Sequence, residues 1–355
     1  MYLGWLMDWM AAIRLLLAVM LLRGLPWRSQ AAVPAVYQPL PGLEPDQLAV
    51  VVNDADPLSR RIGAYYRKRR KIPPANVIHV RFPPDRKVLS PSRFKEIYAR
   101  VLAQTPGRVQ AYALAWTLPF RVGCMSITTA FASGYNDDFC ATGCKPTRSS
   151  PYFNSLIARP FDVLGWRPAM LLAGKSLESV KRLIDRGIRA DHSNPRGTAY
   201  LLRTHDKARS SRAVLFPAIA RHFEGLWPVS SLEQDAIRNR RDVMFYFTGL
   251  THVPDIATNT YLPGAIADHL TSTGGVLSGS RQMSILEWLE AGVTGSYGAV
   301  TEPCNFPQKF PHPGIVMEYY LRGNTLIEAY WKSVAWPGQG VFVGEPLARP
   351  FSYAR

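Results

Sequence analysis

The chain has 355 residues, 47% of them hydrophobic, so it can bury a large core and its length allows one to three domains. Its 42 lysines and arginines outnumber its 26 aspartates and glutamates, which gives a net charge of +16. The clearest basic run, RRIGAYYRKRRK at 60–71, lacks a zinc-finger spacing and an RNP-like aromatic motif. We therefore expect a solvated helix face and no nucleic-acid partner, with an anionic membrane surface or an acidic polysaccharide as the alternative.

The N-terminal region has the order of a signal peptide. In the segment AAIRLLLAVMLLRGLPWRSQAAVP, residues 11–34, one arginine precedes the uncharged run 15–22, and a Gly/Pro break and small residues follow. The apolar run is short for a membrane-spanning helix, which needs about 20 residues. We therefore expect residues 1–31 to be a signal peptide or an N-terminal anchor and 32–47 to be a linker. The rest would be exported, as a periplasmic, secreted or anchored protein.

From residue 48 the chain alternates between apolar runs and amphipathic segments. Strands are predicted at 48–53, 76–82 and 109–116, and helices begin at Asp56-Pro57 and at 90–105. This alternation predicts an α/β fold with a mostly parallel sheet flanked by helices. We assign 48–118 to a first α/β half.

Residues 119–166 interrupt this alternation. They hold three of the four cysteines and many Ser, Gly and Pro residues, so we predict a cysteine-containing loop insertion that is tied down by disulfides.

The alternation returns over 167–355, the second α/β half, which we expect to form one continuous globular unit with 48–118. Its predicted strands are 169–174, 197–204, 243–249 and 275–280; its predicted helices are 176–188, 214–226, 262–275, 283–292 and a broken pair in 315–333. The segment 293–302 is expected to be extended, and 338–350 closes the chain.

The four cysteines are an even number, and they allow three connectivities. In an oxidising compartment we expect all four to be paired. A local bridge between Cys140 and Cys144 is feasible, which would leave Cys124 for Cys304. A zinc site is the competing interpretation, but a C-x3-C spacing without a second close pair is weak, and we predict neither a metal nor a cofactor.

Ligands in open α/β sheets bind beyond the carboxyl ends of the strands. The polar residues and the glycine that follow the predicted strands are therefore the candidates for a ligand pocket, together with two nearby acidic residues. They are Asn53, Asp54, Asp56, Thr117, Thr248, Gly249, Thr251, Asp255 and Glu302, with His252, Ser278 and Ser280 as candidates for chemistry. Alternatively, Asp56 is a helix cap and the serines are turn residues.

Two sequence blocks carry a resemblance to a known family. They are VVVNDADPLSRRIGAYYRKRRKIPPANVIHVRF (50–82) and a C-terminal block that contains LPGAIADHLTSTGG, QMSILEWLEAGVTGSYGAVTEPCNFPQKFPHP and LIEAYWKSVAWPGQGVFVGEPLARPF. Together with the cysteine region they resemble a family of uncharacterised exported bacterial proteins. That family accompanies exosortase, the membrane enzyme that sorts proteins with a PEP-CTERM tail. The resemblance implies a role in the cell envelope but names no reaction.

A more distant resemblance concerns FYFTGLTHV at 245–253. It resembles the strand that carries the catalytic histidine in gingipain- and caspase-like cysteine peptidases, whose next core strand delivers the cysteine. The resemblance implies a three-layer sandwich. Two departures put the catalytic dyad in doubt: Leu250 follows Gly249 where the histidine is expected, and GVLSGS (275–280) holds no cysteine.

Two functions follow. The first is a binding or accessory protein on a degenerate caspase/gingipain-like fold, linked to exosortase sorting or to exopolysaccharide, with envelope proteins or acidic polysaccharide as partners. The alternative is a hydrolase, a peptidase in particular, that uses His252 with Cys304 or with Ser278 or Ser280. Glu302 and His312 lie close to Cys304 in sequence, yet a disulfide fits Cys304 better than a nucleophile does.

Overall fold

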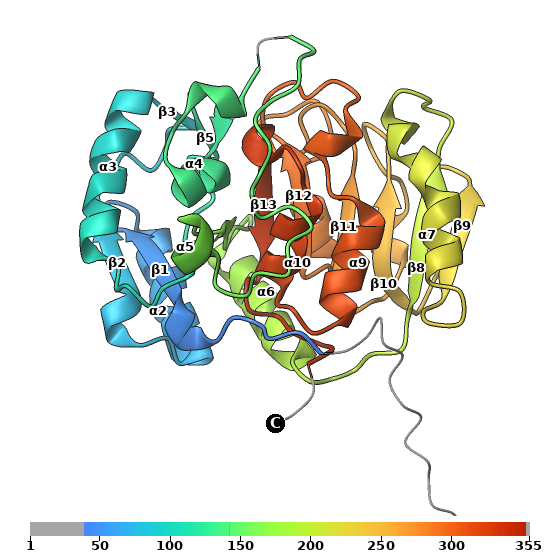
Figure 1. The fold of residues 1–355 in the computed structure, drawn as a ribbon, viewed down its shortest axis with the longest axis horizontal. Coiled ribbons are helices and arrows are strands. Elements are labelled where there is room, and N and C mark those ends of the chain that lie inside the picture. The colour runs from blue at the N-terminus through green and yellow to red at the C-terminus, as the bar shows by residue number, and fades with distance from the viewer. Residues whose placement is uncertain (1–38, 142, 353–355) are drawn as a thin grey trace, which may run out of the picture. The chain divides into compact units, whose positions relative to one another are not determined.

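The computed structural model describes residues 39–141 and 143–352 (Figure 1). The predicted signal peptide or anchor at 1–31 lies outside these residues, as do residues 32–38 of the predicted linker. No helix in the described part of the chain is long and apolar enough to cross a membrane.

A ten-stranded sheet forms the centre, in the order β2-β1-β4-β7-β13-β12-β11-β10-β8-β9. Strands β1, β2, β4 and β7 pair in parallel with one another, and so do β8 to β12, whereas β12 and β13 are antiparallel. The bounds are β1 Leu48–Asn53, β2 Val77–Val80, β4 Ala111–Leu114, β7 Ala169–Leu171, β8 Thr198–Arg203, β9 Val229–Glu233, β10 Val243–Thr248, β11 Tyr261–His269, β12 Gly295–Ala299 and β13 Gly340–Gly344.

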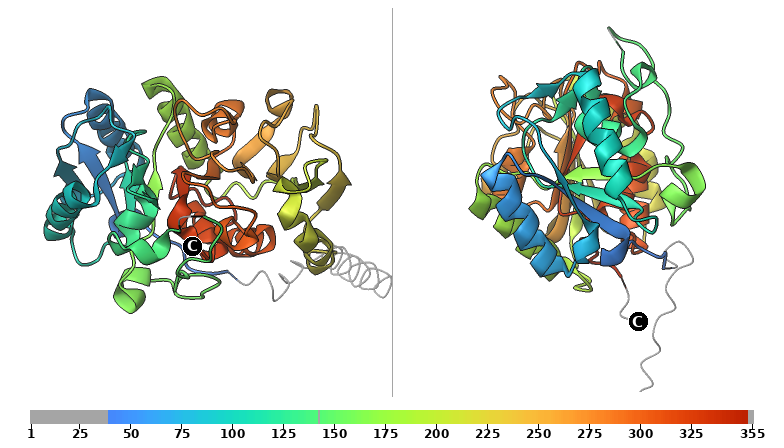
Figure 2. Two further views of the ribbon diagram at one scale, coloured as in Figure 1. Left: turned by 90° about the horizontal axis from the view of Figure 1, so that it is seen from above. Right: turned by 90° about the vertical axis from the view of Figure 1, so that its left-hand side faces the viewer.

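Helices cover both faces of this sheet, which gives the predicted α/β sandwich of three layers (Figures 1 and 2). Helices α2, α6 and α8 pack on one face, and α3, α4, α7, α9 and α10 lie on the other. Their bounds are α2 Pro57–Arg70, α3 Pro91–Gln104, α4 Ile127–Ser133, α6 Leu177–Ala190, α7 Phe216–His222, α8 Leu286–Ala291, α9 Pro313–Leu321 and α10 Leu326–Ser333.

Strands β1 and β10 are apolar up to their last residues, Asn53 and Thr248, because both faces of the sheet are covered. Every residue of β1 is buried, and so is every residue of β10. The register places Val51 between Ile78 of β2 and Leu114 of β4. The continuous apolar runs that predicted β1 and β10 therefore result from helices that cover both faces of the sheet, not one face alone.

The predicted insertion contains small elements and contributes to the core. Strands β5 (Arg121–Val122) and β6 (Met125–Ser126) form a three-stranded sheet with β3 (Val88–Leu89), and a short helix α5 (Pro160–Leu164) ends the segment. Helix α4 is buried from Ile127 to Ala132 and contacts β7 and β13. Its ordered structure therefore comes from packing as well as from disulfides.

Three predictions of secondary structure were wrong. Residues 262–275 were expected to form a helix, but 261–269 form strand β11, and the expected strand 275–280 is a loop. The sequence AIADH lacks β-branched residues except one isoleucine, and its two polar residues are buried with partners, so it does not have the pattern of a strand. The edge strand β9 was missed because none of its residues is fully buried.

Candidate functional site

Loops that follow β7, β10 and β11 surround a cavity of about 380 Å³, which we call the edge pocket. Its volume lies in the range of small-molecule sites. Both polar and apolar side chains line it. They include Lys175, His252, Ser278, Ser280, Gln282 and Glu287. The carboxyl ends of strands that are distant in sequence thus meet at one site, as expected for an α/β sheet.

Three of the predicted residues, His252, Ser278 and Ser280, line the edge pocket together. The prediction placed the two serines at the end of a strand, and the structure places them in the loop that follows β11. His252 is exposed and follows β10, as the sequence suggested. The grouping was therefore predicted, although the element that carries the serines was not.

A hydrogen-bonded network fixes the floor of this loop. The Gln282 Oε1 atom accepts from Thr271 Oγ1 at 2.8 Å, from Thr273 N at 2.7 Å and from Thr273 Oγ1 at 2.9 Å. The Ser280 hydroxyl lies 2.9 Å from Thr273 Oγ1 and accepts from Gln282 N at 3.0 Å. These hydrogen bonds fix the conformation of the loop. They also occupy the Ser280 hydroxyl, so Ser280 is a poorer candidate for a nucleophile.

The geometry shows no assembled catalytic dyad. Within residues 39–141 and 143–352, no hydrogen bond joins the His252 ring to Ser278 or to Ser280. A serine nucleophile needs a base in hydrogen-bond contact and donors for the oxyanion. The edge pocket therefore has polar groups suited to binding, without the contacts that activate a serine.

Lys175 and Glu287 are site residues that sequence reasoning missed. Their ammonium and carboxylate lie 2.6 Å apart, across the pocket wall between the β7 turn and α8. Lys175 directly follows the apolar run 169–174 that predicted β7. The rule that ligands bind beyond the carboxyl ends of strands, here called the strand-end rule, would have identified Lys175 if it had been applied to every strand. Glu287 and Gln282 carry no such signal.

Cys304 lies apart from His252, in a smaller hollow of about 70 Å³. This hollow is lined by Glu302 and Cys304 together with Arg209, Thr271 and Ser272. Glu302 is exposed, and its Oε1 atom accepts from Cys304 N at 2.7 Å, which caps the turn at Cys304. The segment around Cys304 is thus held by its own carboxylate and supplies no acid or base to the edge pocket.

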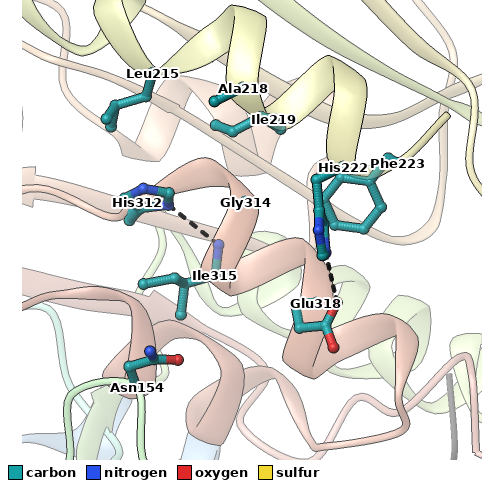
Figure 3. Close-up of a pocket in the computed structure, with 10 residues that line it drawn as sticks. All are labelled: Asn154, Leu215, Ala218, Ile219, His222, Phe223, His312, Gly314, Ile315 and Glu318. Carbon is teal, nitrogen blue, oxygen red and sulfur yellow. Dashed lines mark hydrogen bonds and ion pairs between the residues drawn. The ribbon is translucent and has the colours of Figure 1, made fainter. Parts of the chain in front are cut away.

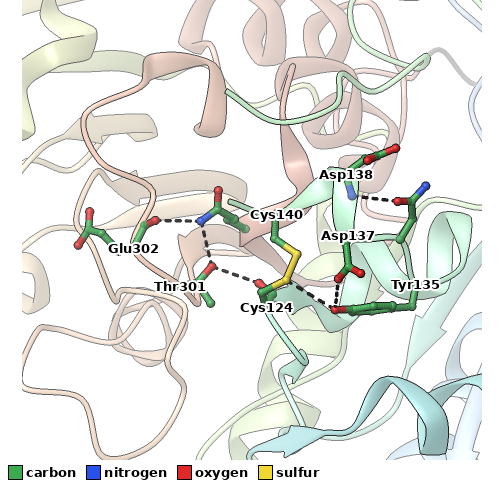
Figure 4. Close-up of a disulfide and its surroundings, with 9 residues drawn as sticks. Cys124, Tyr135, Asp137, Asp138, Cys140, Thr301 and Glu302 are labelled. Carbon is green, nitrogen blue, oxygen red and sulfur yellow. Dashed lines mark hydrogen bonds between the residues drawn. A yellow bond between two sulfur atoms is a disulfide. The ribbon is translucent and has the colours of Figure 1, made fainter. Parts of the chain in front are cut away.

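All four cysteines are in disulfides, but the expected pairing was wrong. Cys124 is bonded to Cys140 (Figure 4), and Cys144 is bonded to Cys304. Cys140 and Cys144 therefore pair with different partners and not with each other. Because Cys304 is oxidised, it carries no thiol that could act as the nucleophile of a peptidase.

The Cys124–Cys140 bridge joins a local polar cluster. The Tyr135 hydroxyl donates to Asp137 and lies 3.6 Å from Cys124 Sγ, and Thr301 Oγ1 donates to the Cys124 carbonyl at 3.2 Å (Figure 4). Cys124, Asp137 and Cys140 have the spacing of a metal-binding group. Both cysteines are consumed by the disulfide, so this group is not a thiolate metal site.

The candidates that follow β1 and β4 have structural roles. Asn53 is fully buried, and its side chain donates to the Phe82 carbonyl and accepts from Phe82 N. Asp54 pairs with His79 at 2.8 Å, and Asp56 caps α2 by accepting from Leu58 N. Thr117 Oγ1 donates to the Gly174 carbonyl at 3.0 Å. These side chains join neighbouring segments and do not line the edge pocket.

The candidates around β10 also support the scaffold. The Thr248 carbonyl accepts from the buried Arg212, and the Thr251 carbonyl accepts from Met283 N, which ties the His252 turn to the pocket loop. Asp255 forms an ion pair with Arg238 at 2.7 Å. A Cβ atom on Gly249 would lie 1.9 Å from the Arg209 carbonyl oxygen, so this position requires glycine for close backbone approach.

Two adjacent titratable side chains at the end of β11 are fully buried. Asp268 is paired with Arg212 at 2.6 Å, and burial raises the pKa of Asp268 to about 6 although the guanidinium opposes this shift. Burial lowers the pKa of His269 to about 3. The His269 ring accepts from Trp288 Nε1 at 2.9 Å and donates to the Met283 carbonyl at 3.1 Å, so it is a neutral structural histidine.

A second cavity, of about 270 Å³, lies between α7 and α9 and is mainly apolar (Figure 3). Leu215, Ile219 and Ile315 form its walls, and the His222 ring lies 3.2 Å from Glu318 at one end. His312, at the other end, accepts from Ile315 N and so caps α9, and burial lowers its pKa. His312 is thus remote from His252 and has a structural role.

The comparisons with known proteins add no relative: no protein-family model matches the chain, and no curated protein matches it. The two disulfides indicate an oxidising, exported environment.

Proposed function

We propose that this chain is an exported, envelope-associated protein that binds a ligand in the edge pocket and does not cleave it. It would be a binding or accessory protein on a degenerate caspase/gingipain-like fold, linked to exosortase sorting or to exopolysaccharide. It would be periplasmic, secreted or held at the membrane by its N-terminal segment.

One observation carries this proposal. The strand after β10 in the sequence is β11, and in the fold that the chain resembles this strand delivers the catalytic cysteine. Here β11 is followed by Leu270, Thr271 and Ser272, and the Thr271 hydroxyl is bonded to Gln282 and Arg209. The only cysteine in the vicinity, Cys304, is in a disulfide. The chain thus has a cavity at this edge of the sheet, but it has no free cysteine there that could act as a nucleophile.

The alternative is a serine hydrolase, and one observation favours it over the cysteine mechanism. Ser278 and His252 line the same pocket, and neither side chain has a hydrogen-bond partner among the residues that the structure describes. A movement of the loop would be needed to bring the imidazole into contact with the hydroxyl.

A probe experiment separates the two functions. The folded protein, purified without reductant, is treated with a fluorophosphonate and with an electrophilic peptidyl ketone, and adducts are measured by intact mass. We expect none. An adduct that forms on native protein, is absent after denaturation and is lost in His252→Ala would establish a hydrolase and overturn the proposal.

The matched control is His205→Ala. His205 is also exposed and follows a strand of the sheet, but it is paired with Asp235 at 2.7 Å outside the edge pocket. Labelling that is lost in both variants would indicate damage to the fold, and thermal unfolding of each variant shows this directly.

A further inference from the structure

We propose that the ligand of the edge pocket is a carbohydrate that bears carboxylate groups, such as a chain of uronic acid units. This inference rests on the proposed function, because it names the ligand of the same pocket. Three features of the pocket carry it: cations without partners beside or within its loop, an amide donor that the loop holds in place, and hydroxyl groups along its wall.

Two cations outside the cavity lining, Lys87 and Arg281, lie beside or within the loop 276–284 that lines the pocket. The Lys87 ammonium lies beside the pocket loop, since a Cβ atom on Gly279 would lie 2.8 Å from Lys87 Nζ. Arg281 is exposed and lies in the same loop, between two residues that line the pocket. Neither cation has an ion pair with a described residue, whereas the acid of the pocket, Glu287, is already paired with Lys175. The net attraction is therefore for an anion.

The N-terminus of α6 adds to this field. This helix of 14 residues begins at Leu177, two residues after Lys175, and Ser176 caps it by accepting from Ser179 N. The N-terminal end of a helix carries a partial positive charge. Because Lys175 is already paired with Glu287, a carboxylate on this side of the pocket would gain from the helix end alone.

Gln282 presents an oriented donor. Its Oε1 atom accepts three hydrogen bonds from Thr271 and Thr273, which fixes the amide plane and directs the amide nitrogen away from them. That nitrogen has no partner within the described residues, and Gln282 lines the pocket. With the Ser278 and Ser284 hydroxyls it offers donors and acceptors that match the hydroxyl groups of a sugar.

The shape of the site favours a carbohydrate over an anionic membrane. The site is a cavity of about 380 Å³ rather than a flat basic face. The large apolar side chains that the described part of the chain exposes are Leu102, Leu156, Val163 and Val214, and none of them lines the pocket. A peripheral membrane site would require such side chains, or a larger basic surface, beside the cations.

The test is calorimetric titration of the protein with oligogalacturonate and with the same oligomer after methyl esterification. The esterified oligomer keeps the sugar hydroxyls and loses the charge. We expect the acidic oligomer to bind at low salt, and the esterified one to bind at least tenfold more weakly. Binding of the acidic oligomer should weaken as sodium chloride rises, because salt screens the charges of Lys87 and Arg281.

Three variants locate the binding. Lys87→Gln should weaken binding of the acidic oligomer about tenfold, as expected for one charge-assisted hydrogen bond. Ser278→Trp, which fills the pocket, should abolish binding. Lys68→Gln is the matched control: Lys68 is exposed in the last turn of α2, remote from the edge pocket, and should leave the affinity unchanged.

Each other outcome overturns the inference in a recognisable way. Equal binding of both oligomers would keep a binding function and remove the role of charge. Absence of binding to either oligomer would exclude a uronate ligand. Binding to phosphatidylglycerol vesicles without binding to the oligomer would assign Lys87 and Arg281 to a membrane surface. Failure of the proposed function itself would appear separately, as covalent labelling by the hydrolase probes.

Discussion

The two disulfides should differ in their contribution to stability, because they close loops of very different length. Cys124–Cys140 spans 16 residues and Cys144–Cys304 spans 160. The loops do not overlap in sequence, so each bridge can be removed without changing the loop of the other. In the chain-entropy account the short loop is worth about 3 kcal/mol and the long loop about 5 kcal/mol. The tenfold ratio of lengths alone gives a difference of about 2 kcal/mol.

The comparison uses two double variants, Cys124→Ala with Cys140→Ala and Cys144→Ala with Cys304→Ala. Guanidinium unfolding without reductant, followed by tryptophan fluorescence, gives the free energy of unfolding and its denaturant slope. Trp116, Trp288 and Trp331 are fully buried, so unfolding exposes their indole rings. The variant that lacks the long-range bridge should lose more free energy and show the steeper slope, because its unfolded chain expands further.

The wild type under reductant serves as the control and should unfold like a variant that lacks all four cysteines. A larger loss for the short-range pair would refute the reasoning. It would mean that the local packing around Tyr135 and Thr301, which contact Cys124, contributes more than chain entropy does.

Two further variants test the buried core at the ends of β10 and β11. The pKa of His269 is lowered from 6.5 to about 3, so its contribution to stability is present above pH 6.5 and is lost as the pH falls toward 3. His269→Gln should therefore flatten the pH dependence of the unfolding free energy over this range, and curves that stay parallel would contradict this. Gly249→Ala places a Cβ atom 1.9 Å from the Arg209 carbonyl oxygen and should cost about 3 kcal/mol in thermal or denaturant unfolding. Gly107→Ala, with no atom within 4 Å of the added carbon, should stay within about 0.5 kcal/mol, and equal losses at both positions would count against the steric explanation.

The fold could be predicted where a strand is buried on both faces by neighbouring layers. The apolar run at 48–53 corresponds to β1 without a shift, and the run at 243–249 corresponds to β10 within one residue. The prediction failed at β11, where Asp268 and His269 are buried because Arg212, Trp288 and the Met283 carbonyl satisfy them. A sequence pattern does not show that a polar side chain has a buried partner far along the chain.

The candidate site could be predicted in part for a similar reason. The strand-end rule identified His252, because the position of a residue after a buried strand is a property of the local sequence. The same rule also identified Ser278 and Ser280, but from a predicted strand at 275–280 that is a loop in the structure. The pairing of the cysteines could not be predicted, because Cys304 lies 160 residues from its partner Cys144 and the local sequence does not show which cysteines come within bonding distance.

The position of β13 has a consequence for how the chain reaches its native state. This strand comes last in sequence, yet it lies between β7 and β12 and so connects the two halves of the ten-stranded sheet. A nascent chain that has not yet supplied Gly340–Gly344 leaves the edges of β7 and β12 without the strand that joins them, and such edges are sites of misassociation. The two halves can order separately during synthesis, but the sheet is complete only when its last strand has emerged. The ten-stranded sheet of this topology therefore stays divided until Gly340–Gly344 pairs with both β7 and β12.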